Sequence, residues 1–172
     1  MLVAHIAVIK KYVGVCSMAV SRGKAFEDVV KRDLLQVPFV LVERLYDVMS
    51  GYKNQRSPAD FIVYNNPFMT YLECKSIRGN SIPFKDIRQL DDLNDRLDLC
   101  IPGVRCWIIV WFIDKKKTYV IDARVAKYLR DNSGKKSIST QDCEKHAVEV
   151  PAMYKRVYAT YDFSHILTKT QI

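Results

Sequence analysis

The 172-residue sequence has few of the residues that build disulfide-rich, zinc-binding or membrane-spanning proteins. It has five cysteines, an odd number with no CxxC pair, which argues against a disulfide framework and a zinc site. Its three histidines are scattered, so HExxH and HxH motifs are absent. The longest apolar run, Cys106–Ile113, has eight residues, whereas a membrane span needs about 18. These absences predict a cytoplasmic protein in a reducing setting, with no membrane partner.

The composition is that of a globular protein with an excess of positive charge. Hydrophobic residues make up 49% and charged residues 27%, and the length suits one domain. The formal net charge is +8, and it is concentrated in 1–24, with four basic and no acidic residues, and in 115–136, with eight basic and two acidic residues. Such a field favours a polyanionic partner, with nucleic acid first and a membrane surface second. A soluble protein that is merely basic is the alternative.

Residues 1–20 are interpreted as an N-terminal extension that precedes a single domain over 21–172. The segment MLVAHIAVIKKYVGVC fits a secretory signal poorly, because no basic stretch precedes its apolar residues and Lys10 and Lys11 interrupt them. An extra strand and a start-site artefact, with Met18 before the first helix, both remain open. No function is assigned to this extension.

The periodicity of apolar residues predicts a mixed α/β domain. Helices are expected over 24–36, 85–99 and 123–131. Strands are expected over 39–48, 61–64, 68–76, 104–113 and 118–121, with the second and third forming a hairpin. Polar loops are expected over 50–58, 77–83 and 132–140, and residues 148–172 show no clean period. This mixture of helices and strands along the chain predicts a central mixed β-sheet flanked by helices.

Three charged residues on the predicted hairpin are the candidates for chemistry. Asp60 begins one strand, and Glu73 and Lys75 point to one face of the returning strand. Two nearby carboxylates repel each other unless a cation intervenes, and Mg²⁺ prefers such oxygens. A metal-bound water beside Lys75 would be a hydrolytic nucleophile. A surface Glu–Lys pair with a strand-capping Asp is the plain alternative, but Leu72 and Cys74 make the opposite face apolar, so the Glu73 face is not obviously the core.

The segments GKAFE, SPADFIVY, YLECKS and RQL follow one another in the sequence. On these segments, over roughly residues 22–121, the chain resembles the PD-(D/E)XK nuclease superfamily and, within it, the RecU-like Holliday junction resolvases of Gram-positive bacteria and their phages. The resemblance implies a restriction-endonuclease-like fold, a Mg²⁺-dependent endonuclease that cuts four-way DNA junctions in recombination or repair, Mn²⁺ as a possible substitute, and a homodimer. Ala59 departs from the idealised motif, in which proline directly precedes aspartate. A projecting stalk is expected within 46–58.

The resemblance also implies roles for single residues. Asp60 and Glu73 would bind the metal, Lys75 would orient or activate the attacking water, Glu27 would supply a further ligand, and Gln89 would be a polar catalytic residue on the following helix. Two of these have structural alternatives. Glu27 is also what a helix dipole favours in a first turn, and Gln89 would also complete a capping box that begins at Asp86.

Phosphate contacts require lysine and arginine. The candidates for DNA binding are Arg22, Lys24, Lys53, Arg56, Arg78 and Lys85. The turn 115–117 is a further candidate, or a solvated hairpin tip. The segments 39–46 and 148–163 are candidates for a dimer interface. Two other functions remain open: a related nuclease that acts on duplex, flaps or ends, and a non-catalytic DNA-binding protein.

Overall fold

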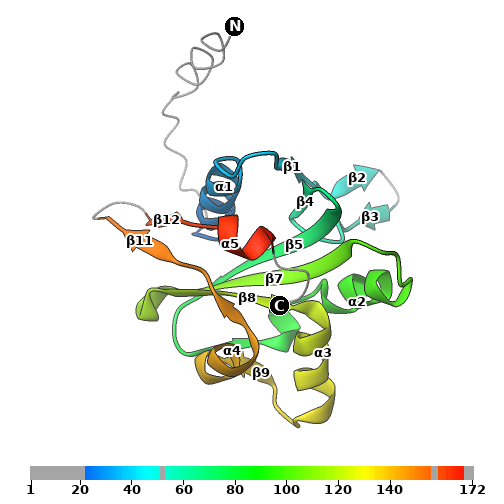
Figure 1. Ribbon diagram of the computed structural model, residues 1–172. Helices are drawn as coiled ribbons and strands as arrows, with labels where there is room; N and C mark the ends of the chain where they lie inside the picture. Colours follow the sequence, from blue (N-terminus) through cyan, green and yellow to red (C-terminus); the bar gives the residue numbers. More distant parts are fainter. Residues whose placement is uncertain (1–21, 51–52, 156–158, 169–172) are drawn as a thin grey trace, which may run out of the picture.

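The computed structural model describes residues 22–50, 53–155 and 159–168. The predicted extension over 1–20 lies outside these ranges. Within them the chain forms an α/β domain around a six-stranded mixed sheet, which confirms the predicted fold class (Figure 1). In spatial order its strands are β1 (Leu41–Arg44), β4 (Phe61–Asn65), β5 (Phe68–Ile77), β7 (Val104–Phe112), β8 (Lys117–Asp122) and β10 (Val148–Glu149). Only β5 and β7 pair in parallel among these strands.

Two hydrophobic cores lie on opposite faces of this sheet. On one face, α1 (Arg22–Leu34) and α5 (Ser164–Leu167) pack against apolar residues that include Phe61 and Trp107. On the other, α2 (Leu90–Asp98), α3 (Ala123–Asn132) and α4 (Thr140–His146) pack against residues that include Ile108. The strand β7 is buried on both sides, as its continuous apolar run requires. None of the described helices is both long and apolar enough to cross a membrane.

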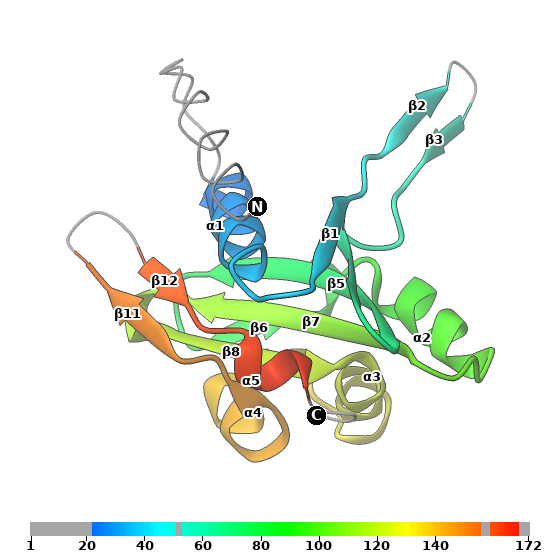
Figure 2. The same cartoon turned by 45° about the horizontal axis from the view of Figure 1, so that its top comes forward.

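Three two-stranded elements surround the central sheet. They are the pairs β2 (Val48–Ser50) with β3 (Lys53–Gln55), β6 (Ser81–Pro83) with β9 (Ser137–Ser139), and β11 (Ala152–Tyr154) with β12 (Ala159–Tyr161). The β2–β3 hairpin projects away from the body of the domain (Figure 2). It lies within the segment 46–58, where the resemblance implies a stalk. The predicted loop over 50–58 is therefore wrong for part of its length, because a paired strand occupies 53–55.

The predicted helix over 85–99 is interrupted. A single 3₁₀ turn, η2 (Phe84–Asp86), is followed by non-helical backbone at Ile87, and α2 begins only at Leu90. Phe84, Ile87 and Leu90 are all buried in one core, and the break at Ile87 allows all three side chains to pack there. Gln89 is consequently the N-cap of α2, without a side-chain cap bond, and the capping box suggested for Asp86 and Gln89 does not form.

The C-terminal third contains elements that the apolar pattern did not reveal. The expected loop over 132–140 includes β9, and α4 follows it without a predicted counterpart. The signal for α4 is local: Ser139 and Asp142 form a capping box in which each side chain accepts from the other residue's backbone N–H. Three short strands and α5 then occupy much of the segment that showed no period. These strands have two or three residues each, too few to show alternation.

Gly103 is expected to be intolerant of a side chain. Its φ is +81°, and a Cβ there would lie 2.7 Å from the carbonyl oxygen of Pro67. Gly103→Ala should therefore lower the free energy of unfolding by at least about 2 kcal/mol in urea denaturation. Gly134→Ala is the matched control, because φ is +66° there but no atom lies within 4 Å of the added carbon. The Gly134→Ala protein should lose only about 1 kcal/mol of its free energy of unfolding. Equal losses in the two variants would contradict the steric explanation.

Candidate active site

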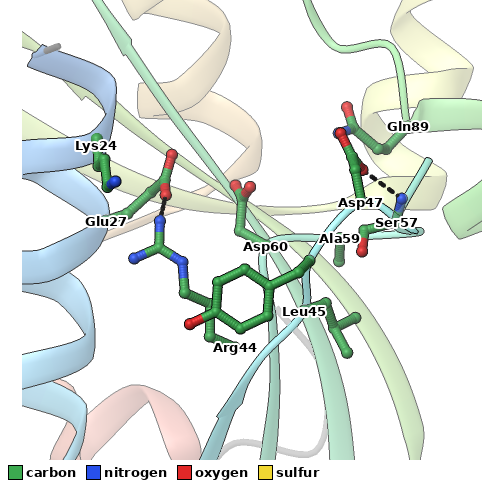
Figure 3. A pocket seen from close by; sticks show the side chains of 10 residues that line it. Lys24, Glu27, Arg44, Leu45, Asp47, Ser57, Ala59, Asp60 and Gln89 are labelled. Atoms are coloured by element: carbon green, nitrogen blue, oxygen red, sulfur yellow. Dashed lines mark hydrogen bonds and ion pairs between the residues drawn. The ribbon is translucent and has the colours of Figure 1, made fainter. Parts of the chain in front are cut away.

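The first helix and the ends of β1 and β4 surround a cleft of about 420 Å³ (Figure 3). Lys24 and Glu27 reach it from α1, and Asp60 reaches it from the residue before β4. Its other lining residues are Arg44, Leu45, Tyr46, Asp47, Ser57, Ala59 and Gln89. Two of the predicted metal ligands, from segments 33 positions apart in the sequence, thus share one cleft.

The β4–β5 hairpin fixes Asp60 beside the ExK strand, as the sequence predicts. Phe61 pairs with Leu72, and the backbone N–H of Asp60 donates to the carbonyl of Leu72 at 3.2 Å. The Asp60 carboxylate in turn accepts the backbone N–H of Cys74 at 2.7 Å. The aspartate is therefore held by the same strand that carries Glu73 and Lys75.

Glu73 and Lys75 lie on one face, as predicted, but that face is a core face. Their parallel partners on β7 are Ile108 and Val110, which are fully buried. The Glu73 side chain is 0% exposed, whereas Lys75 is 23% exposed and its Nζ lies 2.5 Å from Glu73 Oε1. Glu73 Oε2 is buried and has no hydrogen-bond partner within the described part of the chain. A buried, incompletely satisfied carboxylate is costly to the fold, so a surface Glu–Lys pair does not describe it.

The three predicted ligands influence one another electrostatically. Burial, followed by the charge of Asp60, raises the pKa of Glu73 to about 7, against the opposing effect of Lys75. Burial, then Asp60, also raises the pKa of Glu27, and Arg44 opposes this. Burial raises the pKa of Asp60, partly offset by the bond from Cys74 and by Lys75. The site therefore holds an excess of carboxylates that a cation would relieve.

Arg44 belongs to this site and was not predicted. Its guanidinium bonds to the carboxylate of Glu27, and its Nη1 lies 3.0 Å from Asp28 Oδ1. Arg44 follows the buried Val42 by two positions on β1, so both side chains point to the same face of the strand. A charged residue two positions after a core valine on the same strand is the one sequence signal that could have identified Arg44.

Gln89 also lines the cleft, from the N-cap of α2 rather than from within a helix. Its Oε1 is buried and makes no hydrogen bond with any described residue. Within the described part of the chain, Gln89 and Glu73 thus each leave a buried side-chain oxygen without a hydrogen-bond partner. Such atoms are uncommon in folded proteins and suit a site that receives another group.

A second cleft of about 370 Å³ adjoins the first and shares Asp47 and Gln89 with it. Its remaining lining residues are Arg56, Lys75, Asp86 and Arg88. Arg56 was predicted as a DNA-binding residue, whereas Arg88 was not. The only sequence signal for Arg88 was its position directly before Gln89. The acidic cleft is therefore continuous with a space that three basic side chains line.

The other predicted DNA-binding residues are more dispersed. Lys24 lines the first cleft, but Arg22, Arg78 and Lys85 are exposed residues that line neither cleft. Lys53 belongs to the projecting hairpin through β3. In the 115–117 turn, Lys117 lies 3.3 Å from Glu144 and 3.7 Å from Glu149, so its charge is compensated within the protein.

Glu27, Asp60 and Glu73 are the residues that would hold a divalent ion. They do not form a tight three-ligand cluster among the described residues, because each side chain has another partner: Arg44 for Glu27, the backbone of Cys74 for Asp60, and Lys75 for Glu73. The Glu73 oxygen, which has no hydrogen-bond partner among the described residues, and the raised pKa values of all three carboxyl groups nevertheless fit a cation. An all-oxygen donor set suits Mg²⁺ or Mn²⁺ rather than a softer metal.

Comparisons with known proteins identify the family and a structure with the same fold. No curated protein matches the sequence. Among the solved structures that match is Archaeoglobus fulgidus Hjc, described as a Holliday junction resolvase from an archaeal hyperthermophile. The two are 12% identical, with a TM-score of 0.50, and the match covers 74% of this chain and 95% of that chain, which shows a shared fold. The family described as RecU, recombination protein U, matches residues 23–164. The resemblance inferred from the ordered motifs is thereby confirmed: the chain belongs to the RecU family of recombination proteins.

Proposed function

We propose that the protein is a Mg²⁺-dependent endonuclease that resolves four-way DNA junctions during recombination or repair. The observation that supports this best is the group of Glu27, Asp60 and Glu73, whose pKa values are all raised, beside Lys75 and next to a second cleft that Arg56 and Arg88 line. Membership of the RecU family supports the nuclease and recombination roles, and the name of the structural relative supports the junction as substrate. The choice of Mg²⁺, with Mn²⁺ as a substitute, and the cytoplasmic location are part of the proposal.

In this proposal each side chain has a distinct task. Asp60 and Glu73 hold the ion, which when bound would supply a Lewis acid for charge on the phosphate and lower the pKa of water. Glu27 contributes a further oxygen, directly or through water. Lys75, the partly exposed member of the set, orients the attacking water and steadies the phosphate. Gln89 offers its free carbonyl oxygen to water or substrate at the junction of the two clefts.

Two symmetric cuts in a four-way junction call for a two-fold homodimer. The segments 39–46 and 148–163 remain the proposed interface. Exposed apolar side chains occur in both: Phe39, which is 96% exposed, and Leu41 in the first, and Met153 in the second. Among the described strands β1 is an edge strand, and an edge strand presents backbone groups that can pair with another chain. This proposal expects a dimer in analytical ultracentrifugation.

The experiment that tests the substrate compares cleavage of a four-way junction, a flap and a linear duplex at equal concentration in Mg²⁺. Junction resolution predicts paired symmetric nicks near the crossover and little cutting of the other two. Equal cutting of all three would instead support a duplex- or end-processing nuclease of the same superfamily. Metal-indifferent binding with no scission in Mg²⁺ or Mn²⁺ would support a non-catalytic DNA-binding protein.

Arg56 and Arg88 are expected to bind the DNA backbone beside the site. Replacing either by Gln should weaken binding to all DNA sequences alike and reduce the slope of log affinity against log salt by about 1, because one phosphate contact is lost. Fluorescence anisotropy at several salt concentrations measures both effects. Lys145→Gln, the same loss of charge on an exposed residue of α4, is the control. An unchanged salt slope in both arginine variants would contradict the assignment of the second cleft.

A further inference from the structure

Tyr46, the last residue of the segment 39–46 proposed for the dimer interface, is an aromatic residue to which the proposed chemistry assigns no task. Its side chain is 73% exposed, and it lines the cleft that also contains Glu27 and Asp60. Exposed apolar side chains are common on protein surfaces and need no explanation when they are scattered. Among the described residues, however, Tyr46 is the only large exposed apolar side chain that lines this cleft.

The ring of Tyr46 is supported from within the protein. The guanidinium carbon of Arg44 lies 5.8 Å from the Tyr46 ring centroid and 5.7 Å from that of Phe61, which is fully buried. Arg44 is itself fixed by its ion pairs with Glu27 and Asp28. A cation at this distance from an aromatic ring attracts it. The exposed tyrosine is therefore backed by an anchored arginine rather than left as a loose surface side chain.

The position of Tyr46 links the acidic site to the projecting hairpin. The residue lies between β1 and β2 in the chain, so it directly precedes the first strand of that hairpin. Its neighbour Asp47 accepts the backbone N–H of Ser57 at 2.7 Å, which joins the two legs of the hairpin at this level (Figure 3). Tyr46 and Asp60 line the same cleft, so a nucleic acid with a phosphate at Asp60 would bring a neighbouring nucleotide close to this ring.

We infer that Tyr46 stacks on an unpaired or unstacked nucleobase next to the phosphate that is cut. This rests on the proposed nuclease function and deepens it. Any base offers a π-face to an aromatic ring, so such stacking does not depend on sequence. In intact duplex the bases are stacked on one another and unavailable, whereas a branch point or a bulge exposes them at lower cost. Tyr46 thus makes the cleft prefer branched or locally unpaired DNA over perfect duplex.

The test is equilibrium binding in Ca²⁺ to two 30-base-pair duplexes, one fully paired and one with a single extrahelical 2-aminopurine. The full-length protein is compared with Tyr46→Ala, Tyr46→Trp and Tyr46→Leu. Tyr46→Ala should weaken binding to the bulged duplex about tenfold or more and leave the paired duplex within about twofold. Tyr46→Trp should retain the preference, and Tyr46→Leu, which is apolar but lacks a π-face, should lose it. Quenching of 2-aminopurine should follow the same order.

Two results would overturn the inference. One is Tyr46→Ala protein that binds and quenches the bulged duplex as the unaltered protein does. The other is equal loss of binding to both duplexes with a lower melting temperature, which would identify a structural role. Because no scission is measured, failure of the proposed nuclease function leaves this outcome unaffected. Conversely, a protein that cuts junctions normally but shows no preference for the bulge refutes the stacking role alone.

Discussion

Asp60→Asn protein is expected to cut a four-way junction about 1000-fold more slowly than the unaltered protein. Its carboxylate is proposed to hold a metal ion that supplies several kcal/mol of transition-state stabilisation, and 1.36 kcal/mol corresponds to a factor of ten in rate. The amide retains the oxygen that accepts the Cys74 backbone N–H, so the hairpin should keep its geometry. Single-turnover cleavage of a labelled junction in Mg²⁺ measures the rate.

Asp95→Asn provides the matched control, because Asp95 is an exposed residue on α2 that lines neither cleft. It should cut at the rate of the unaltered protein. Junction affinity in the Asp60→Asn protein should be unchanged or higher, since one negative charge beside the DNA phosphates is lost. Cleavage within about tenfold of the unaltered protein would mean that Asp60 is not a ligand for a catalytic ion.

Glu73→Gln protein is expected to be more stable than the unaltered protein at pH 8 without metal, by up to about 3 kcal/mol, while losing cleavage. Burial raises the pKa of Glu73 from its ordinary value of 4.5 to about 7. Each pKa unit is worth about 1.4 kcal/mol, so ionising this carboxyl inside the fold is costly at alkaline pH. The glutamine side chain has a similar shape and no charge to ionise.

The direction of this stability change with pH follows from the number of protons that the folded and unfolded chains bind. Below pH 4.5 Glu73 is protonated in both the folded and the unfolded protein, so the substitution should change little. Between pH 4.5 and 7 the folded protein retains a proton that the unfolded chain loses, so this group's contribution makes stability fall as pH rises. Urea denaturation at pH 4, 6 and 8 in EDTA measures the difference. Glu43→Gln, on an exposed residue of β1, should show no such rise. A Glu73→Gln protein that is less stable at pH 8 would contradict this account.

The sequence was sufficient to predict the part of the fold that depends on local strand pairing. The hairpin that carries Asp60, Glu73 and Lys75 could be predicted because a turn signal and two β-rich runs are adjacent in the chain, and register then follows from the pleat. Glu27 could be placed only through the resemblance, since its proximity to Asp60 depends on how α1 packs on the sheet. The structure brings both residues to one cleft.

Other features depend on tertiary packing and were missed or misjudged. The burial of Glu73 could not be predicted from alternation, because β5 is covered on both faces and its Glu73 face mixes Glu73 and Lys75 with apolar residues such as Tyr71 and Ile77. The helix breaks at Ile87, whose side chain is buried. The spacing of Ile87 from the next apolar residues also fits an unbroken helix, so the sequence did not reveal the break. Arg44 and Arg88 each had only a weak local signal, and their places in the two clefts depend on how segments distant in the sequence pack together.

The central claim is that Glu27, Asp60 and Glu73 form the divalent metal site of a junction-cutting nuclease. The most direct measurement is strand scission of a four-way junction by the unaltered protein and by the Asp60→Asn/Glu73→Gln double variant, each in EDTA, Ca²⁺, Mg²⁺ and Mn²⁺. The account predicts paired nicks only for the unaltered protein in Mg²⁺ or Mn²⁺, with junction binding retained by both proteins in Ca²⁺. Scission in EDTA, or scission by the double variant in Mg²⁺, would contradict it.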